Sequence, residues 1–289
     1  MRPATTLILF ALLTGCTSNG QRIDQLAAAA GMRRIAAETG GYGSYIYMKR
    51  EAPQGTGQLT VFLEGDGRPW RNGVEPSVDP TTGNPVSLQL LLRTPSMAAY
   101  VTRPCYHDLR GPRCTPERWT MARYAEDIVA SMTEAVRIAR REAGAKQVVL
   151  VGYSGGGTLA VLVAERLDNV AAVVTISANL DVDAWVRHHR YLPLTGSLNP
   201  ASSERSHPWP ELHLHGGKDA VVPAATTAHY FERYPHAKQI VMEHHDHVCC
   251  WVEEWPQLWE QLGHSLLNAS RAASPTSGKS VNTPSMPRL

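Results

Sequence analysis

The sequence has no long apolar run, no internal repeat and no large excess of either charge. A membrane-spanning helix needs about 18 consecutive apolar residues, and no segment reaches that length. The formal charge of +2 includes four cations near the two ends, and setting these four aside leaves −2 on the body from 16 to 268. A neutral-to-acidic body gives no electrostatic reason to expect nucleic-acid binding.

The composition is that of a globular protein. Of the 289 residues, 43% are hydrophobic and 19% are charged, so the chain can bury a core. The length fits one large α/β domain or two small ones. General disorder and a low-complexity fibre are excluded. Residues 269–289, which are rich in Ser, Pro, Thr and Ala without periodicity, are predicted to form a disordered tail.

The first 15 residues have the pattern of an export signal. Arg2 precedes about ten apolar or small residues, a run too short for an anchor helix. The segment ends in Leu13-Thr14-Gly15-Cys16, which resembles the bacterial lipobox, whose Cys is acylated and begins the mature protein. Ordinary cleavage nearby, with Cys16 left free, is the alternative. Because Thr17 and not Asp follows, the same resemblance favours the outer membrane, facing the periplasm.

Four further cysteines would then lie in an oxidising compartment. Cys105 and Cys114 bracket a short polar loop that contains Gly111, and a disulfide between them would close this loop. Cys249 and Cys250 are adjacent in sequence. Since vicinal disulfides are uncommon, we expect two buried thiols there.

Strand and helix patterns alternate along the body. Strands are predicted at 45–48, 59–63, 99–102, 148–151, 170–177, 211–215 and 239–242, and helices at 87–93, 120–143, 156–167, 224–234 and 251–267. Residues 16–41 are interpreted as a linker that leads into a helix, and 42–268 as the folded domain. This alternation predicts an α/β fold with a mostly parallel sheet and helices on both faces. Residues 183–208 are predicted to form a small cap.

A glycine-rich turn follows the strand at 148–151. The run Gly152-Tyr153-Ser154-Gly155-Gly156-Gly157 contains the pattern G-x-S-x-G between a strand and a helix. Small neighbours let such a turn close, and the turn lifts the serine hydroxyl off the sheet. Partial positive charge at the helix N-terminus would favour an oxyanion there. We therefore predict that Ser154 is a nucleophile.

A serine nucleophile needs a base and an acid that orients the base. The predicted base is His247, which follows the last strand, and the predicted acid is Asp219, which follows the strand at 211–215. Both would lie at the carboxyl edge of the sheet, where ligands bind. Asp181 is the alternative acid, although its position also suits the N-cap of a helix.

Over residues 42–268 the chain resembles the α/β-hydrolase fold. The likeness rests on the glycine-rich turn, the Gly217-to-Pro223 acid loop and a late histidine. Segments 179–185 and 193–200 resemble an uncharacterised group of bacterial lipoprotein serine hydrolases. The resemblance implies an oxyanion hole made by the backbone N–H groups of Asp66 and Gly155. Many members of the fold carry His-Gly where this chain has Glu64-Gly65-Asp66-Gly67, so the acidic side chains must point away from the oxyanion.

Two other patterns in the sequence have simpler interpretations. The histidines between 244 and 247 suggest a metal cluster, but no second ligand group with suitable spacing is evident, and no metal site is predicted. Trp251, Trp255 and Trp259 share one helix face, which indicates core packing.

The sequence thus predicts an exported, lipid-anchored serine hydrolase of a small ester-like molecule, without a cofactor. Amide hydrolysis and acyl transfer use the same groups. A catalytically silent scaffold that binds ligands in the envelope is the alternative from another class. The acyl group, the alcohol and the oligomeric state stay open.

Overall fold

The computed structural model describes residues 17–49, 57–109 and 111–273, and for 264–273 it gives only the course of the backbone. The strands are β1 (Arg33–Thr39), β2 (Tyr42–Met48), β3 (Gln58–Leu63), β4 (Trp70–Arg71), β5 (Glu75–Pro76), β6 (Ala98–Val101), β7 (Gln147–Tyr153), β8 (Val170–Ile176), β9 (Glu211–Gly216) and β10 (Lys238–Met242). The α-helices are α1 (Asn19–Ala29), α2 (Val86–Arg93), α3 (Glu126–Glu142), α4 (Gly155–Ala164), α5 (Val182–His189), α6 (Ala228–Arg233) and α7 (Trp251–Ala273). Short 3-10 helices lie at η1 (Pro116–Arg118), η2 (Pro200–Ser202) and η3 (Ala224–Thr227).

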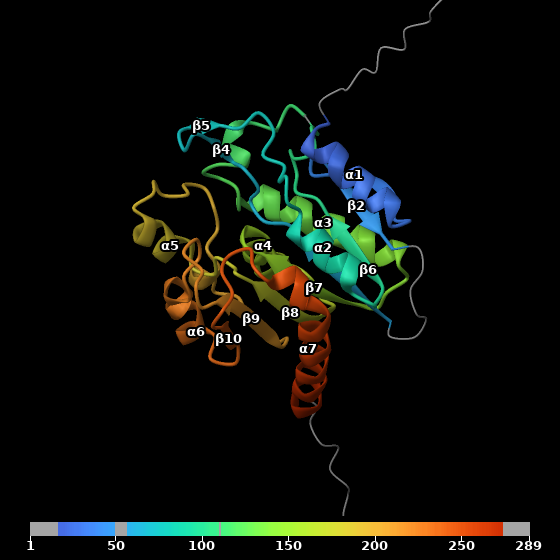
Figure 1. The fold of residues 1–289 in the computed structure, drawn as a ribbon, viewed down its shortest axis with the longest axis vertical. Coiled ribbons are helices and arrows are strands. Elements are labelled where there is room, and N and C mark those ends of the chain that lie inside the picture. Colours follow the sequence, from blue (N-terminus) through green and yellow to red (C-terminus); the bar gives the residue numbers. More distant parts are fainter. Residues whose placement is uncertain (1–16, 50–56, 110, 274–289) are drawn as a thin grey trace, which may run out of the picture.

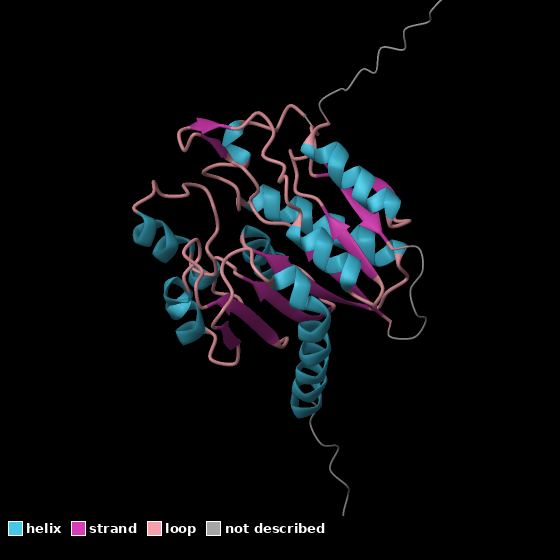
Figure 2. Cartoon of the chain, in the orientation of Figure 1, coloured by secondary structure: helices cyan, strands magenta, loops and turns pink. Residues whose placement is uncertain are grey.

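One eight-stranded sheet runs through the molecule in the order β1-β2-β6-β3-β7-β8-β9-β10 (Figures 1 and 2). The β1–β2 and β2–β6 pairs are antiparallel, and every pair from β6 to β10 is parallel. Parallel strands place their carboxyl ends at one edge, so the loops after β3, β7, β9 and β10 gather there. The β4–β5 hairpin stands apart from this sheet.

The central strand β7 shows why its sequence is continuously apolar. Val148 and Leu150 belong to a buried cluster with side chains of α3 and α4. Their neighbours Val149 and Val151 belong to a second cluster with α1, α2 and α7. Because successive side chains of a strand point to opposite faces, a strand covered on both faces needs apolar residues throughout. The predicted fold class is confirmed.

The interpretation of 16–41 as a linker and helix is wrong for part of that segment. Residues Arg33–Thr39 form β1, which pairs antiparallel with β2. Thr39 and Tyr42 are the pair of residues next to the turn. Gly40 and Gly41 make the turn, with φ values of 60° and 81° that only glycine adopts at little cost. A two-residue Gly-Gly loop is a hairpin signal. The strand was missed because this edge strand is mostly exposed and shows no apolar alternation.

Predicted helices are confirmed in place, with shifts at their ends, except that the one expected at 224–234 begins as the 3-10 helix η3 and is α-helical only over Ala228–Arg233. The helix expected at 120–143 begins at Glu126. The final helix extends to Ala273, so the prediction of a disordered tail is wrong for 269–273. The remainder of the predicted tail lies outside the described residues. Trp251 and Trp255 are fully buried, as core packing of that helix face requires. Among the described helices, none has the length and apolar content to cross a bilayer.

Candidate active site

The turn between β7 and α4 holds Ser154 in a backbone conformation that is rare for a residue with a side chain. Its φ is 53° and its ψ is −126°. A Cβ added at Gly152 would lie 2.2 Å from the carbonyl oxygen of Gly156, and one added at Gly156 would lie 2.2 Å from the carbonyl oxygen of Leu63. The glycines therefore permit the tight turn, and the turn presents the serine at the sheet edge.

Ser154, His247 and Asp219 form one hydrogen-bonded line. Nε2 of His247 lies 3.1 Å from Oγ of Ser154, and Nδ1 lies 2.9 Å from Oδ2 of Asp219. Since an ionised carboxylate only accepts, Nδ1 carries a proton and Nε2 is the acceptor of the neutral ring. We call these three residues the hydrogen-bonded triad. The structure thus brings together the three residues that the sequence singled out.

Both oxygens of the Asp219 carboxylate accept hydrogen bonds. Oδ1 accepts the N–H groups of Val221 and Val222 at 2.9 and 2.8 Å, which leaves Oδ2 for His247. Burial alone would raise the pKa of Asp219, but the hydrogen bond from His247 and the Val222 N–H outweigh it, and the pKa lies below its ordinary value. The acid is therefore ionised at neutral pH and fixes the orientation of the imidazole.

Asp181, the alternative acid, has a different position. It is the N-cap of α5, and its Oδ1 accepts the N–H of Ala184 and the side-chain amide of Asn199, both at 3.0 Å. This confirms the N-cap interpretation. Of the two candidates, Asp219 is the one in contact with His247.

A compact loop carries His247. Oδ1 of Asp246 accepts the N–H groups of Val248 and Cys249 at 2.8 and 2.7 Å, and the hydroxyl of Tyr153 donates to the carbonyl of His247 at 2.9 Å. Tyr153 is buried, and its ring packs against the imidazole of His247. Together these contacts hold the backbone around His247 in place.

The expectation of two buried thiols in this loop is wrong. Cys249 and Cys250 are joined by a disulfide, and Cys249 is exposed while Cys250 is half-buried. The two cysteines lie in the surface loop immediately before the first residue of α7, and not in the core.

Asp66 lies in the loop after β3, beside the turn at Ser154, and its carboxylate is in contact with arginine side chains. Its carboxylate contacts Arg103, accepts from Nη1 of Arg123 at 2.8 Å and accepts from the hydroxyl of Tyr124 at 2.7 Å. Burial alone would raise the pKa of Asp66, but the charges of Arg123 and Arg103 hold it well below its usual range. We call Asp66, Arg103, Arg123 and Tyr124 the Asp66 cluster.

The partners of Asp66 were not found from the sequence. Arg103 follows β6 and Arg123 precedes α3, and both are almost completely buried. Nη2 of Arg103 also donates to the carbonyl of Arg123 at 2.9 Å, which ties the two loops together. Arginines are rarely buried unless paired, but no local motif marks such a pair in advance.

The loop after β3 packs directly against the turn at Ser154. A Cβ added at Gly155 would lie 2.1 Å from Oδ1 of Asp66, and one added at Gly65 would lie 3.3 Å from Cβ of Ser154. The backbone N–H groups of Asp66 and Gly155 therefore belong to two loops that meet beside the serine. The Asp66 carboxylate contacts its arginines and also lies against Gly155.

Glu64, two residues earlier, is a buried carboxyl, and no cation among the described residues forms an ion pair with it. It accepts the N–H groups of Gly65 and Ser87 at 3.1 Å each, near the start of α2. Burial raises the pKa of Glu64 to about 7, although these N–H groups lower it in part. Glu64 is thus poised to change charge near neutral pH.

A cavity of about 790 Å³ opens beside Ser154 and His247. Its lining is mainly apolar and includes Trp70, Met121, Trp185 and Leu194. The predicted cap segment contributes α5 and the loop after it. Nε1 of Trp185 donates to the carbonyl of Val221 at 2.7 Å, which fastens the cap to the Asp219 loop.

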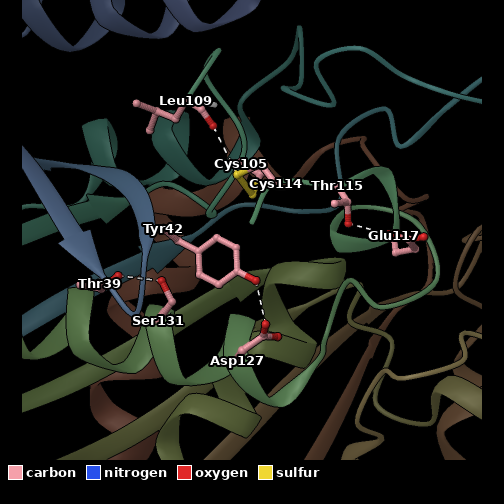
Figure 3. The surroundings of a disulfide bond; sticks show 9 residues. All are labelled: Thr39, Tyr42, Cys105, Leu109, Cys114, Thr115, Glu117, Asp127 and Ser131. Carbon is pink, nitrogen blue, oxygen red and sulfur yellow. Dashed lines mark hydrogen bonds between the residues drawn. A yellow bond between two sulfur atoms is a disulfide. The ribbon is translucent and has the colours of Figure 1, made fainter. Parts of the chain in front are cut away.

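The predicted disulfide between Cys105 and Cys114 is confirmed (Figure 3), with a Cα–Cα distance of 5.4 Å. It closes the loop that follows Arg103. Cys16 and the predicted signal at 1–15 lie outside the described residues. Within the described ranges no group of three or more His, Cys, Asp or Glu side chains is arranged to hold a metal.

Comparisons with known proteins agree with this architecture. A family model described as alpha/beta hydrolase fold matches residues 105–197. A search of curated proteins gave no match. An esterase from Pyrococcus furiosus is similar in structure, with a TM-score of 0.60 and 14% identity over 82% of this chain and 90% of the esterase. Est1E from Butyrivibrio proteoclasticus has a TM-score of 0.54 and 13% identity over 81% of this chain and 99% of Est1E.

A third similar structure is an alpha-beta serine hydrolase homologue from Coxiella burnetii. Its TM-score is 0.52 and its identity 15%, over 81% of this chain and 97% of that one. At such identities the likeness bears on the fold alone. The parallel sheet, the tight turn from β7 to α4 and these matches lead to one conclusion: the chain has the α/β-hydrolase fold.

Proposed function

We propose that this protein is a serine hydrolase that cleaves carboxylic esters through an acyl-enzyme. The observation that carries the proposal is the hydrogen-bonded triad at the floor of an apolar cavity. Neutral Nε2 of His247 faces the Ser154 hydroxyl, and ionised Asp219 holds the other ring nitrogen. This is the arrangement that lets a serine hydroxyl lose its proton as it attacks.

In the first half-reaction, Oγ of Ser154 attacks the ester carbonyl carbon and its proton passes to Nε2 of His247. The N–H groups of Asp66 and Gly155 donate to the resulting oxyanion. The C–O bond to the alcohol then breaks, and the imidazolium gives its proton to the leaving oxygen. Asp219 stabilises the imidazolium while it exists.

In the second half-reaction, water replaces the alcohol. His247 takes a proton from the water as it attacks the acyl carbon, and then returns that proton to Oγ of Ser154. The carboxylic acid leaves and the enzyme is restored. No metal or organic cofactor takes part in these steps.

Turnover of p-nitrophenyl esters with graded acyl length tests this function. We expect release of p-nitrophenolate by the wild type, and a loss of about 10⁶-fold in kcat for Ser154→Ala, with an unchanged unfolding transition. A matched control is Ser202→Ala, in the η2 turn away from the cavity lining, which should keep wild-type turnover. A wild type that binds esters without cleaving them would show a silent scaffold instead.

We further propose that the protein is exported and anchored in the outer membrane through acylated Cys16, facing the periplasm. The lipobox-like end of the signal and the Cys105–Cys114 disulfide, which suits an oxidising compartment, support this. Radiolabelled palmitate fed to cells should label the wild type and leave Cys16→Ala unlabelled. Equal labelling of both would reject the anchor.

A further inference from the structure

Most of the large hydrophobic side chains that are exposed among the described residues lie around one opening. Among the described residues, those with more than two-fifths of their surface exposed are Leu26, Val74, Val78, Tyr191, Leu192, Val221, Val241 and Val248. Five of the eight line the cavity at Ser154. Val78 lies in an adjoining hollow that shares Trp70 with this cavity, and only Leu26 and Val241 lie elsewhere.

These six residues come from four separate segments that surround one opening. Val74 and Val78 belong to the β4–β5 hairpin and the residues after it, and Tyr191 and Leu192 to the loop after α5. Val221 lies next to Asp219 in the acid loop, and Val248 follows His247. We call these six side chains the apolar collar. Figure 1 shows the β4–β5 hairpin and α5 on the same side of the molecule, at the left of the view.

Single exposed hydrophobic residues are ordinary, whereas a contiguous group marks a contact surface. The collar is continuous with the apolar lining further in, so one apolar path leads from the surface to the Ser154 hydroxyl. Leu192 and Val74 are 71% and 75% exposed, and an apolar partner would remove this surface from water. An occupant that reaches the serine along such a path is an acyl chain joined to an ester.

The start of α1 relates this opening to the proposed lipid anchor. Nδ2 of Asn19 donates to the carbonyl of Thr81 at 2.8 Å, and Asn19 lines the hollow that contains Trp70 and Val78. Cys16 precedes Asn19 by three residues, a span of at most about 11 Å even when fully extended. An acyl group on Cys16 would therefore enter the bilayer beside the collar.

We propose that the apolar collar rests on the lipid surface that holds the anchor, and that the substrate is a long-chain acyl ester drawn from this surface. The inference rests on the proposed hydrolase function and on acylation of Cys16. The collar gives the acyl chain an apolar route from the bilayer to Ser154. For esters that enter from water, each further CH₂ of the chain buried along this route should raise kcat/KM by up to about fourfold.

The test uses the full lipidated chain in phosphatidylcholine vesicles, so that the anchor holds every variant on the membrane equally. Two rates are measured: hydrolysis of p-nitrophenyl palmitate dissolved in the vesicles and of water-soluble p-nitrophenyl acetate. Replacing both collar residues in Val74→Ser/Leu192→Ser should lower the palmitate-to-acetate ratio at least tenfold. Val241→Ser, an equally conservative change at an exposed valine outside the collar, should leave the ratio unchanged.

Three results separate the possible failures. If the wild type hydrolyses neither ester, the proposed function itself is wrong. If it hydrolyses acetate but not palmitate, or if the double variant keeps the wild-type ratio, the lipid-facing collar is overturned, and a protein partner becomes the better explanation for the patch. A fall of the ratio in Val241→Ser as large as in the double variant would also overturn it.

Discussion

The hydrogen-bonded triad and the Asp66 cluster flank the same serine, and each contains a carboxylate with a pKa below its ordinary value. They differ in the partner of that carboxylate. Asp219 faces an imidazole, a ring that can accept a proton at one nitrogen while it donates from the other. Asp66 faces two guanidinium groups, which only donate hydrogen bonds and keep their protons.

Under the proposed function, the triad moves a proton whereas the Asp66 cluster holds a shape. The imidazole of the triad would cycle between its neutral and charged forms while Asp219 stays in place. The Asp66 cluster has no such freedom, and it fixes the loop after β3 against the turn at Ser154 through two arginines from distant loops. Changes in the triad should therefore alter turnover, and changes in the Asp66 cluster should alter stability first.

The largest effect is expected for Asp219→Asn. An asparagine keeps the shape but favours the wrong imidazole tautomer, so kcat should fall by up to about 10⁴-fold, with little change in unfolding. Asp181→Asn is the matched control, since asparagine also caps helices well and Asp181 does not contact His247. Steady-state ester hydrolysis measures both. A dead Asp181→Asn beside an active Asp219→Asn would transfer the acid role to Asp181.

Next in size is Asp66→Asn, which leaves two buried guanidinium groups without a carboxylate. Removing one partner of a buried ion pair costs about 3–5 kcal/mol in the free energy of unfolding. Urea denaturation measures it. Glu142→Gln breaks the exposed pair with Arg33 and should cost at most about 1 kcal/mol. Equal losses in the two variants would show that the Asp66 cluster is no more than a surface ion pair.

The disulfide of Cys105 and Cys114 closes the loop that begins just after Arg103, and so supports the Asp66 cluster through the backbone. Replacing both cysteines by serine should lower the free energy of unfolding by about 2–3 kcal/mol, because the unfolded chain gains the freedom of an open loop.

The matched control for that disulfide is the double serine variant at Cys249 and Cys250. These two are adjacent, so their bond closes no loop of further residues and the same entropy argument gives no comparable loss. Urea midpoints, with mass spectrometry of the non-reduced peptides, check both. Two free thiols at Cys105 and Cys114 in the wild type would reject the premise.

The smallest effect concerns Glu64, which lies two residues before Asp66 in the sequence and pairs with no cation of the described ranges. Folding raises its pKa from 4.5 to about 7, so its contribution to stability is complete below pH 4.5 and is lost as the pH rises through about 7. Between about pH 6 and pH 8 the wild type should lose about 1 kcal/mol more than Glu64→Gln. Parallel stability curves for the two would mean that Glu64 does not titrate in this range.

The central sheet and the triad could be predicted because each depends on short-range sequence. β7 has the continuous apolar pattern of a strand because both its faces are buried. Ser154, Asp219 and His247 each follow a strand in a parallel sheet. The glycines at the turn are required by backbone contacts within the same few residues. Local pattern and global fold agree at these positions.

The remainder could not be predicted because it depends on contacts between distant segments. Arg103 and Arg123 become partners of Asp66 only when two loops fold over the end of β3, and neither loop carries a motif. β1 is an edge strand, so its exposed side gives no apolar alternation. The vicinal disulfide was missed because the adjacency of two cysteines does not indicate whether they are exposed. Their exposure depends on their position in the surface loop before α7.

The proposed function depends most on Ser154 being a nucleophile activated by His247. A fluorophosphonate probe, followed by peptide mapping with mass spectrometry, measures this directly. We expect one modified residue, Ser154, in the wild type, no labelling in Ser154→Ala, and labelling slowed by orders of magnitude in Asp219→Asn. Labelling that survives in Ser154→Ala, or a wild type that does not react at all, would contradict it.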